Sequence, residues 1–295
     1  MTRNPTLMPL LATVLGIGFF SAMDGVMKSG ALAIGAYSAF FLRSLLGFLM
    51  IAPFWWLRTR RWPSKQVMRI HLTRGVVVAF MGWSFFFALV RLPLAEAIAL
   101  SFISPLIALY LAAVLLGETI QRKAIIAALL GLAGVIVIVG GRIGRERLTE
   151  DATIGLIALM VSALLYAWNL VLQRQQALVA KPSEVSAFQN GIVTLALLAG
   201  TPFLLVWPET TRTWLDLGSG AALAVAAALC LSWAYARAEA QVLVPVEYTG
   251  FLWAALFGWL MFGEEVSLST AAGAVLIVIG CWLATRSTPP EQAAI

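Results

Sequence analysis

Length, composition and charge together exclude a soluble domain and a nucleic-acid-binding protein. The chain has 295 residues, of which 61% are hydrophobic and 12% are charged, whereas soluble domains carry about 45–50% apolar and about 25% charged residues. Such a surface cannot be covered with polar groups, so lipid is the natural solvent. The net charge of +6 arises from basic residues in short gaps between apolar runs, which is a pattern of membrane topology.

In chain order, the sequence contains ten apolar runs of membrane-spanning length. These runs cover residues 7–27, 33–57, 72–90, 93–116, 121–140, 153–173, 184–206, 218–236, 244–263 and 268–285. Each run must satisfy its own backbone hydrogen bonds in lipid, and none alternates strictly between apolar and polar residues. We therefore expect ten transmembrane helices and an all-α integral membrane protein.

The basic residues predict the orientation. With the N-terminus in the cytoplasm, thirteen Lys and Arg residues fall on the inner side and six on the outer side. The inner loop before the third run contributes six of them: Arg58, Arg60, Arg61, Lys65, Arg69 and Arg74. The lone histidine, His71, is assigned to the same loop as a solvated side chain. We expect a multi-pass protein of the bacterial inner membrane with both termini cytoplasmic.

The two halves of the chain resemble each other at a shift of 146 residues. Gly117-Glu118 falls on Gly263-Glu264, Phe20 falls on Tyr166, and Lys28 falls on Arg174. We therefore predict a duplication with repeats at 1–145 and 146–295. Because each repeat has five spans, the two repeats would enter the membrane from opposite sides. Inverted repeats of this kind place a solute site near the midplane and give two alternative closures.

Small residues recur every fourth position in the fourth and ninth runs. The stripes are Ser104, Ala108 and Ala112 in the first repeat and Gly250, Ala254 and Gly258 in the second. Such stripes allow close helix packing, and they could also let the helices slide or hinge beside a pathway. Pro105 is expected to kink the fourth span. The candidate hinge or close-packing residues are Pro105, Gly250 and Gly258.

These features resemble the drug/metabolite transporter superfamily in its EamA-type members. The matching motifs are Phe102-Ile103-Ser104-Pro105, Gly117-Glu118 and Gly131-Leu132-Ala133-Gly134, then Pro245-Val246-Glu247-Tyr248-Thr249-Gly250 and Gly263-Glu264, and Phe41-Leu42-Arg43. Within the superfamily the chain is most similar to YddG-type exporters of aromatic amino acids and methionine. The resemblance implies ten helices in two five-helix repeats and uniport without an obligatory coupling ion.

Charges inside apolar runs cost about 2.5–3.5 kcal/mol each on insertion scales and need an explanation. Arg43 is the most deeply placed; it either pairs with Asp24 or Glu96 or clamps a solute carboxylate in a bidentate manner. Asp24 and Glu96 are placed near outer span ends, where they could reach water. Arg237, Glu239 and Glu247 flank the inner turn before the ninth span and are expected to pair there.

Aromatic and polar residues within the spans are the candidates for lining a pathway. They are Trp83, Phe87, Ser101, Ser104, Tyr166, Trp168, Asn169, Trp233, Tyr248 and Trp253. Lipid contact or core packing is the alternative role for each. Tryptophan, tyrosine and asparagine at mid-depth seek hydrogen-bond partners away from lipid, so a cavity lined by them would suit flat, partly apolar solutes.

The leading functional hypothesis is a carrier that exports Phe, Trp, Tyr and Met by alternating access. The alternative is a carrier of another small metabolite or cationic drug, such as a purine, riboflavin, S-adenosylmethionine or methyl viologen, with proton coupling left open. We expect no enzymatic activity, no metal site and no cofactor, because the chain has one histidine and no cysteine cluster. The expected partners are a small-molecule solute and the lipid bilayer, and no nucleic acid. The sequence leaves the oligomeric state open.

Overall fold

The chain folds into an all-α bundle, which we describe from a computed structural model. The structure describes residues 7–92, 97, 98, 101, 104, 107, 108, 111, 122–140, 150–263 and 268–285. The first-half elements are α1 (Leu7–Ile34), α2 (Ala36–Thr59), α3 (Lys65–Leu89) and α6 (Arg122–Gly140). The second-half elements are α7 (Glu150–Val179), α8 (Pro182–Leu198), α9 (Thr201–Leu204), α10 (Thr211–Tyr235), α11 (Ala240–Leu243), η1 (Val244–Tyr248), α12 (Thr249–Phe262) and α13 (Leu268–Thr285).

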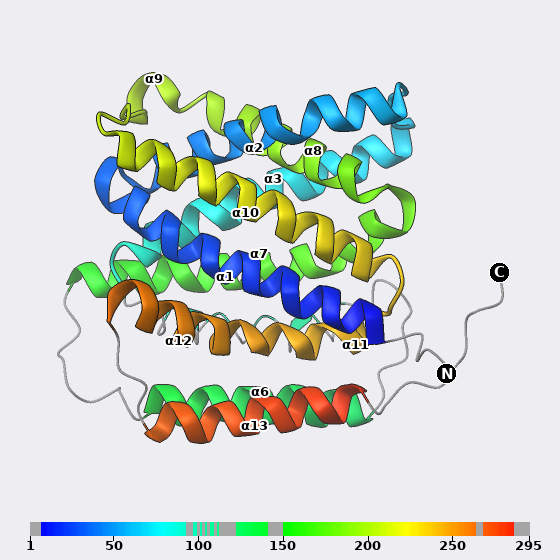
Figure 1. Ribbon diagram of the computed structural model, residues 1–295, viewed down its shortest axis with the longest axis vertical. Coiled ribbons are helices and arrows are strands. Elements are labelled where there is room, and N and C mark those ends of the chain that lie inside the picture. Colours follow the sequence, from blue (N-terminus) through cyan, green and yellow to red (C-terminus); the bar gives the residue numbers. More distant parts are fainter. Residues whose placement is uncertain are drawn as a thin grey trace.

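The helices of the two halves interleave in one bundle (Figure 1). In this view they lie across the picture, and α6 and α13 form a side-by-side pair at the bottom. Within the described residues, five helices are long and apolar enough to cross a membrane by length and composition: α1, α2, α3, most of α7 and α10. Large apolar side chains such as Phe80, Leu195 and Leu260 are exposed on outer faces, as expected where lipid is the solvent.

The contacts between the halves follow a pseudo-twofold pattern. If α1, α2, α3 and α6 correspond to α7, α8, α10 and α13, then α1 packs on α10 as α7 packs on α3. In the same way α3 packs on α8 as α10 packs on α2, while α2 contacts α8 and α6 contacts α13. Every contact in this set has its counterpart when the halves are exchanged, and the predicted fold of two inverted repeats is confirmed.

A pair of basic residues shows the same symmetry in detail. Lys28 on α1 donates from Nζ to the backbone oxygen of Leu92, just beyond α3, at 3.4 Å. Arg174 on α7 donates from Nη1 to the backbone oxygen of Tyr235, the last residue of α10. In each half a cation of the first helix therefore meets a carbonyl at the C-terminal end of the third, where the helix dipole favours positive charge.

Two helix boundaries differ from the predicted ones, and both differences bear on the site. Helix α1 continues to Ile34 instead of ending near 27, so Asp24 lies well inside it and not at its end. Helix α3 begins at Lys65, where the Ser64 hydroxyl accepts from the Val67 amide at 3.3 Å. An N-cap at Ser64 extends the helix two turns before the apolar run. The assignment of His71 and Arg74 to a solvated loop was therefore wrong.

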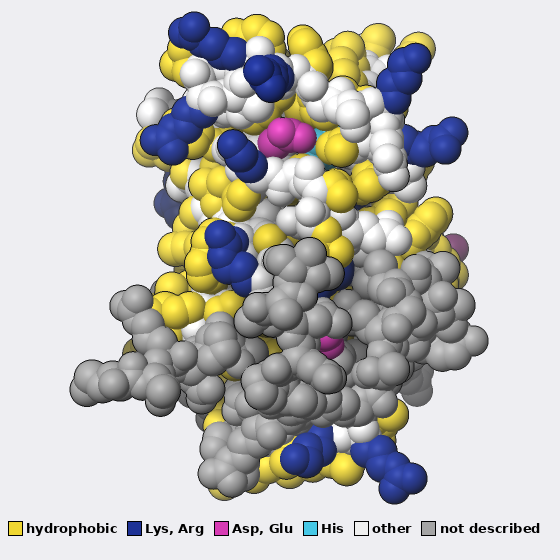
Figure 2. All heavy atoms as spheres, turned by 90° about the vertical axis from the view of Figure 1, so that its right-hand side faces the viewer, with side chains coloured by type: hydrophobic (Ala, Val, Ile, Leu, Met, Phe, Trp, Pro, Cys, Tyr) yellow, Lys and Arg dark blue, Asp and Glu magenta, His cyan; other side chains and the backbone are white. Residues whose placement is uncertain are grey.

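Most of the exposed basic residues lie at one end of the bundle, which is the right-hand side of Figure 1 and faces the viewer in Figure 2. The turns between α2 and α3, α7 and α8, and α10 and α11 meet there. The exposed basic side chains in or next to these three turns are Arg58, Arg60, Arg61, Lys65, Arg69, Lys181 and Arg237. We call this end the basic end. The predicted residues Glu96, Pro105, Ala112, Glu118 and Glu264 lie outside the described residues.

Candidate functional site

A cavity of about 190 Å³ lies between the two halves of the bundle. Its lining comes from α1, α2, α3, α7, α8, α10, η1 and α12, together with Ile98 and Ser101. The polar and charged lining residues are Ser21, Asp24, Arg43, Arg74, Ser101, Ser162, Tyr166, Asn169, Gln173, Gln189 and Glu247. Phe20, Phe40, Phe85 and Phe86 supply an apolar wall. The volume is that of about six water molecules, which suits a solute of amino-acid size.

Arg43 is a buried cation with spare hydrogen-bonding capacity. Its side chain lies over the ring of Phe40, with Cζ 4.9 Å from the ring centroid, and its residue is only 6% exposed. Nη2 donates to Ser44 Oγ at 3.2 Å, whereas Nε is buried without a hydrogen-bond partner among the described residues. An unsatisfied guanidinium donor costs free energy unless a ligand fills it. Arg43 therefore offers a site for an anionic group in the cavity.

Asp24 faces the same cavity from α1. Among the described residues no ion pair within 4 Å joins it to Arg43, so the sequence hypothesis of a direct structural pair does not hold. Both side chains instead line the cavity as separate opposite charges. A dipolar solute could therefore bind one charge with each end.

Glu247 is held by two tyrosines from the second half. Tyr166 Oη on α7 donates to Oε2 at 2.6 Å, and Tyr235 Oη at the end of α10 donates to Oε1 at 3.2 Å. The residue is 5% exposed and belongs to η1. The expected pairing of Glu247 with Arg237 at the turn was wrong, because Arg237 is exposed and lies over the ring of Trp233.

Arg74 enters the cavity from α3 and is anchored by three amides of α7. Nε donates to Asn169 Oδ1 at 3.0 Å, Nη2 donates to Gln173 Oε1 at 2.7 Å, and Nη1 donates to Gln176 Oε1. These amides are spaced four and three residues apart, so they share one helix face. Neutral amides fix the guanidinium without cancelling its charge. The cavity thus contains two arginines and two carboxylates.

The structure brings only some of the sequence candidates to the cavity. Seven of them line it: Asp24, Arg43, Ser101, Tyr166, Asn169, Glu247 and Gly250. Ser101 Oγ bonds back to the Ala97 oxygen at 2.9 Å. The Gly250 oxygen accepts from Ser21 Oγ at 3.3 Å, which joins α12 to α1. Gly258 is buried on the same helix.

The remaining aromatic and polar candidates do not line this cavity. Trp168 is 43% exposed on the outer face of α7. Phe87 lies beneath Arg91, Trp233 lies beneath Arg237, and Ser104 donates to the Ala163 oxygen at 2.7 Å. The other three pack in the core: Trp83 against Tyr37, Tyr248 against Gly131 and Trp253 against Gly18. The apolar wall is phenylalanine instead of tryptophan.

Sequence reasoning missed Arg74, Gln173 and His71. A usable signal was present, because Asn169 and Gln173 lie four residues apart in the predicted span 153–173 and Gln176 follows on the same helix face just beyond it. A polar stripe inside a membrane helix needs a buried partner. Arg74 supplies it.

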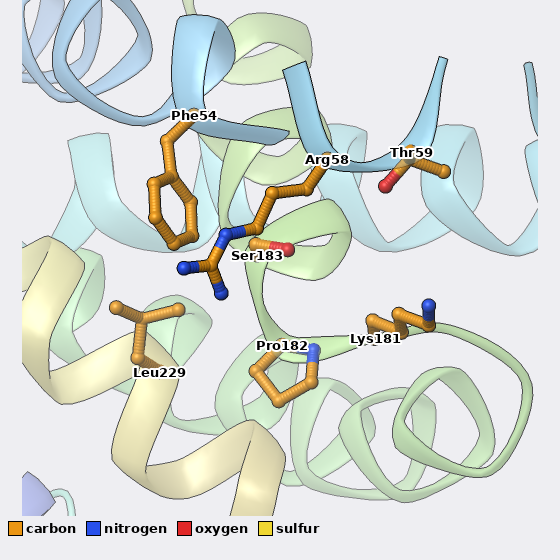
Figure 3. Close-up of a pocket in the computed structure, with 7 residues that line it drawn as sticks. All are labelled: Phe54, Arg58, Thr59, Lys181, Pro182, Ser183 and Leu229. Atoms are coloured by element: carbon orange, nitrogen blue, oxygen red, sulfur yellow. The ribbon is translucent and has the colours of Figure 1, made fainter. Parts of the chain in front are cut away.

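A second hollow lies at the basic end and is separate from the cavity (Figure 3). Its volume is about 510 Å³ and it opens at the surface. The lining residues are Phe54, Arg58, Thr59, Lys181, Pro182, Ser183 and Leu229. In Figure 3 the Arg58 guanidinium points between Phe54 and Leu229, and its Cζ is 4.3 Å from the Phe54 ring centroid. The hollow shares no lining residue with the central cavity. We place the candidate site in the central cavity, because that cavity lies between the two halves and holds the buried charged residues.

Comparison with known proteins fits the duplicated architecture. The profile of the EamA-like transporter family matches twice, over residues 7–140 and 153–286. The chain belongs to the EamA-like transporter family. It is therefore a multi-pass membrane transporter of the drug/metabolite transporter superfamily and not an enzyme. Membership implies a small-molecule solute and a lipid bilayer as its partners.

Relatives within the EamA-like family differ in their solutes. The chain is 28% identical over 281 residues to the pseudopaline exporter CntI of Pseudomonas aeruginosa, covering 94% of this chain and 96% of the relative. It is 33% identical over 139 residues to the aromatic amino acid exporter YddG of Ancylobacter novellus, covering 45% and 47% of the two chains. A solved crystal structure with 23% identity superposes with a TM-score of 0.75 over 93% of this chain and 96% of the other. That likeness shows the fold alone.

Proposed function

We propose that this EamA-like transporter exports zwitterionic amino-acid-type solutes, with phenylalanine, tryptophan, tyrosine and methionine as the first candidates. The observation that carries the proposal is Arg43. It is a buried cation whose Nε has no partner in the part of the chain that the structure describes, and its cavity also holds Asp24 and a phenylalanine wall. An α-carboxylate would accept from the guanidinium, because charge-assisted bonds to a carboxylate are the strong ones.

The ammonium and the side chain of such a solute would also find partners. Asp24 and Glu247 supply negative charge within the same cavity. Phe20, Phe40, Phe85 and Phe86 supply apolar area for an aromatic or thioether side chain. A cavity with both signs of charge and one apolar wall distinguishes an amino acid from a purely cationic drug.

The proposed transport cycle follows from the repeats. We take 1–145 and 146–295 as the limits of the two halves, both termini as cytoplasmic, and the bacterial inner membrane as the location. Inverted halves around one cavity provide two closures, and switching between them is alternating access. We infer uniport, with coupling to a proton through Asp24 or Glu247 as the alternative.

A second candidate is a larger metabolite that carries more than one carboxylate. The specific observation is that Arg74 adds a second guanidinium to the cavity without a carboxylate partner within 4 Å in the described residues. The near full-length similarity to a pseudopaline exporter supports testing a solute other than the four amino acids.

Efflux from liposomes that contain only the pure chain tests the proposal. Vesicles preloaded with labelled phenylalanine, tryptophan or methionine should lose the label faster than protein-free vesicles, with and without an imposed pH difference. If none of the three moves, the amino-acid proposal is wrong. Movement only with a pH difference would replace uniport by proton coupling.

A further inference from the structure

A continuous line of polar side chains joins the basic end to the central cavity. It begins at Glu184 in the first turn of α8, whose side chain is 12% exposed. Glu184 Oε1 lies 3.1 Å from Nε2 of His71, which is fully buried. His71 Nδ1 contacts Gln176 Nε2, and Gln176 Oε1 accepts from Arg74 Nη1. Arg74 then faces the cavity.

Arg74 determines which groups along this line donate a hydrogen and which accept one. A guanidinium has only donors, so Gln176 must turn its carbonyl oxygen to Arg74 and its NH₂ group to His71. That NH₂ group can only donate, so His71 Nδ1 must be an unprotonated acceptor. The remaining ring hydrogen lies on Nε2 and is donated to the Glu184 carboxylate. The contacts therefore select a neutral imidazole in its Nε2–H tautomer.

A second proton on His71 would break this arrangement. Nδ1–H would face the NH₂ group of Gln176, so two donors would meet. If the Gln176 amide turned over to relieve this, its NH₂ would face Arg74 Nη1, which is again a donor. Arg74 would keep its bonds to Asn169 and Gln173 but lose the third. One proton at His71 thereby changes how the cavity arginine is held.

The groups that contact His71 show how a proton could reach it. From α8 it faces Glu184 and the ring of Phe188, which stacks on the imidazole at 4.6 Å between centroids. From α7 it faces Gln176, and from its own helix Arg74 follows one turn later. Glu184 is the only carboxylate among these contacts, and it is the most exposed polar side chain in the line. A proton would therefore reach His71 through Glu184 from the basic end.

We infer that His71 is a positioning residue: its protonation state determines, through Gln176, whether Arg74 keeps its third hydrogen bond. In the neutral state Arg74 is fixed for solute binding, and in the protonated state it is loosened. This inference rests on the proposed function for its effect on transport. The tautomer it requires can be tested without any solute.

The solute-independent test uses the fact that the chain has one histidine. Full-length protein carrying ¹⁵N-labelled histidine and a histidine-free purification tag would give one imidazole signal pair by NMR. We expect the neutral form to carry its hydrogen on Nε2. The Glu184→Leu, Gln176→Leu double variant removes both partners that select the tautomer and should allow the Nδ1–H form to appear. A wild-type Nδ1–H tautomer, or a ring protonated throughout from about pH 8 to about pH 5, would overturn the inference whatever the solute is.

The transport test compares two His71 variants. Asn places a carbonyl oxygen near the position of Nδ1 and does not titrate, whereas Leu offers no acceptor. Wild-type KM should rise about tenfold when the pH at the basic end is lowered far enough to protonate His71. His71→Asn should keep the neutral-pH KM and lose the pH dependence, and His71→Leu should show the raised KM at every pH. Arg69→Gln, exposed on the same helix, is the matched control.

A purely structural role for His71 gives a different result. Both variants would then lower the amount of folded protein or kcat together, and the wild-type pH profile would survive in His71→Asn. That outcome contradicts the inference while leaving the proposed function intact. Absence of flux in the wild type would contradict the proposed function alone, because the tautomer measurement would still decide the inference.

Discussion

At the scale of single residues, the charged side chains of the cavity differ in how many hydrogen-bond partners they have. Arg74 donates to three amides, one from each of its nitrogens, and Glu247 accepts from two tyrosines. Arg43 differs, because within the described ranges its Nε has no partner and Asp24 is beyond ion-pair distance. The residue with unfilled capacity is the one best able to bind a solute, since its donors gain a partner only when the cavity is occupied.

Neutralising Arg43 should weaken solute binding more than it weakens folding. A hydrogen bond to a charged group is worth about 1.5–3 kcal/mol, so Arg43→Gln should raise KM for phenylalanine by about 10- to 100-fold. Arg43→Lys should recover part of this, because the charge returns without the bidentate geometry. Arg58→Gln in the surface hollow is the matched control and should leave KM unchanged. Equal KM values in Arg43→Gln and wild type would exclude the clamp.

Tyr166 offers a milder change in the same cavity. Tyr166→Phe removes the 2.6 Å donor to Glu247 while keeping the ring. Loss of one such bond in a buried site costs about 1–3 kcal/mol, so thermal unfolding should occur at a lower temperature. Trp168→Phe, on the exposed face of the same helix, should change the unfolding temperature little. A melting curve of Tyr166→Phe that overlays wild type would mean that Glu247 does not depend on this tyrosine.

At the scale of helices, close packing depends on glycines that leave room for a neighbouring ring. Gly131 on α6 is such a position, because a Cβ there would lie 2.5 Å from the Tyr248 ring. Tyr248 is fully buried, so the ring has little room to move. The contact fixes α6 against η1, the segment that carries Glu247 into the cavity.

Adding a methyl group at Gly131 should therefore destabilise the bundle. Overpacking of this kind costs about 1–3 kcal/mol, so Gly131→Ala should unfold at a lower temperature in detergent. Gly218→Ala on α10 is the matched control, because its Cβ would meet nothing within 4 Å. Alanine also favours a helix over glycine, so Gly218→Ala should be neutral or slightly stabilising. The packing argument is wrong if both variants melt alike.

The same scale shows what the sequence could and could not predict. The apolar runs located the helices well, because a chain in lipid has few alternatives. The start of α3 was misplaced because the predicted span followed hydropathy, whereas the Ser64 cap extends the helix through His71 and Arg74. Which aromatic residues face the cavity was not predictable, because nearly all faces of these helices are apolar. That choice depends on the neighbouring helices, which turn Trp168 outward and Phe40 inward.

At the scale of the whole molecule, the inverted repeats predict that matched positions lie on opposite sides of the membrane. Ala33 near the end of α1 and Val179 at the end of α7 are separated by 146 residues, and both are exposed. With Cys230 and Cys281 replaced, a membrane-impermeant thiol reagent added to intact cells should label Ala33→Cys and spare Val179→Cys. Disrupted cells should label both, which serves as the control. Labelling of both in intact cells would contradict the proposed topology.

The central claim is that a cavity between the two halves recognises a solute carboxylate through Arg43. The most direct measurement compares phenylalanine with phenethylamine, which lacks only the carboxylate, as competitors of labelled phenylalanine efflux from liposomes. We predict that wild type prefers phenylalanine by about 10- to 100-fold and that Arg43→Gln loses most of this preference. A wild type that does not distinguish the two compounds, or an Arg43→Gln variant that distinguishes them as well as wild type does, would contradict the account.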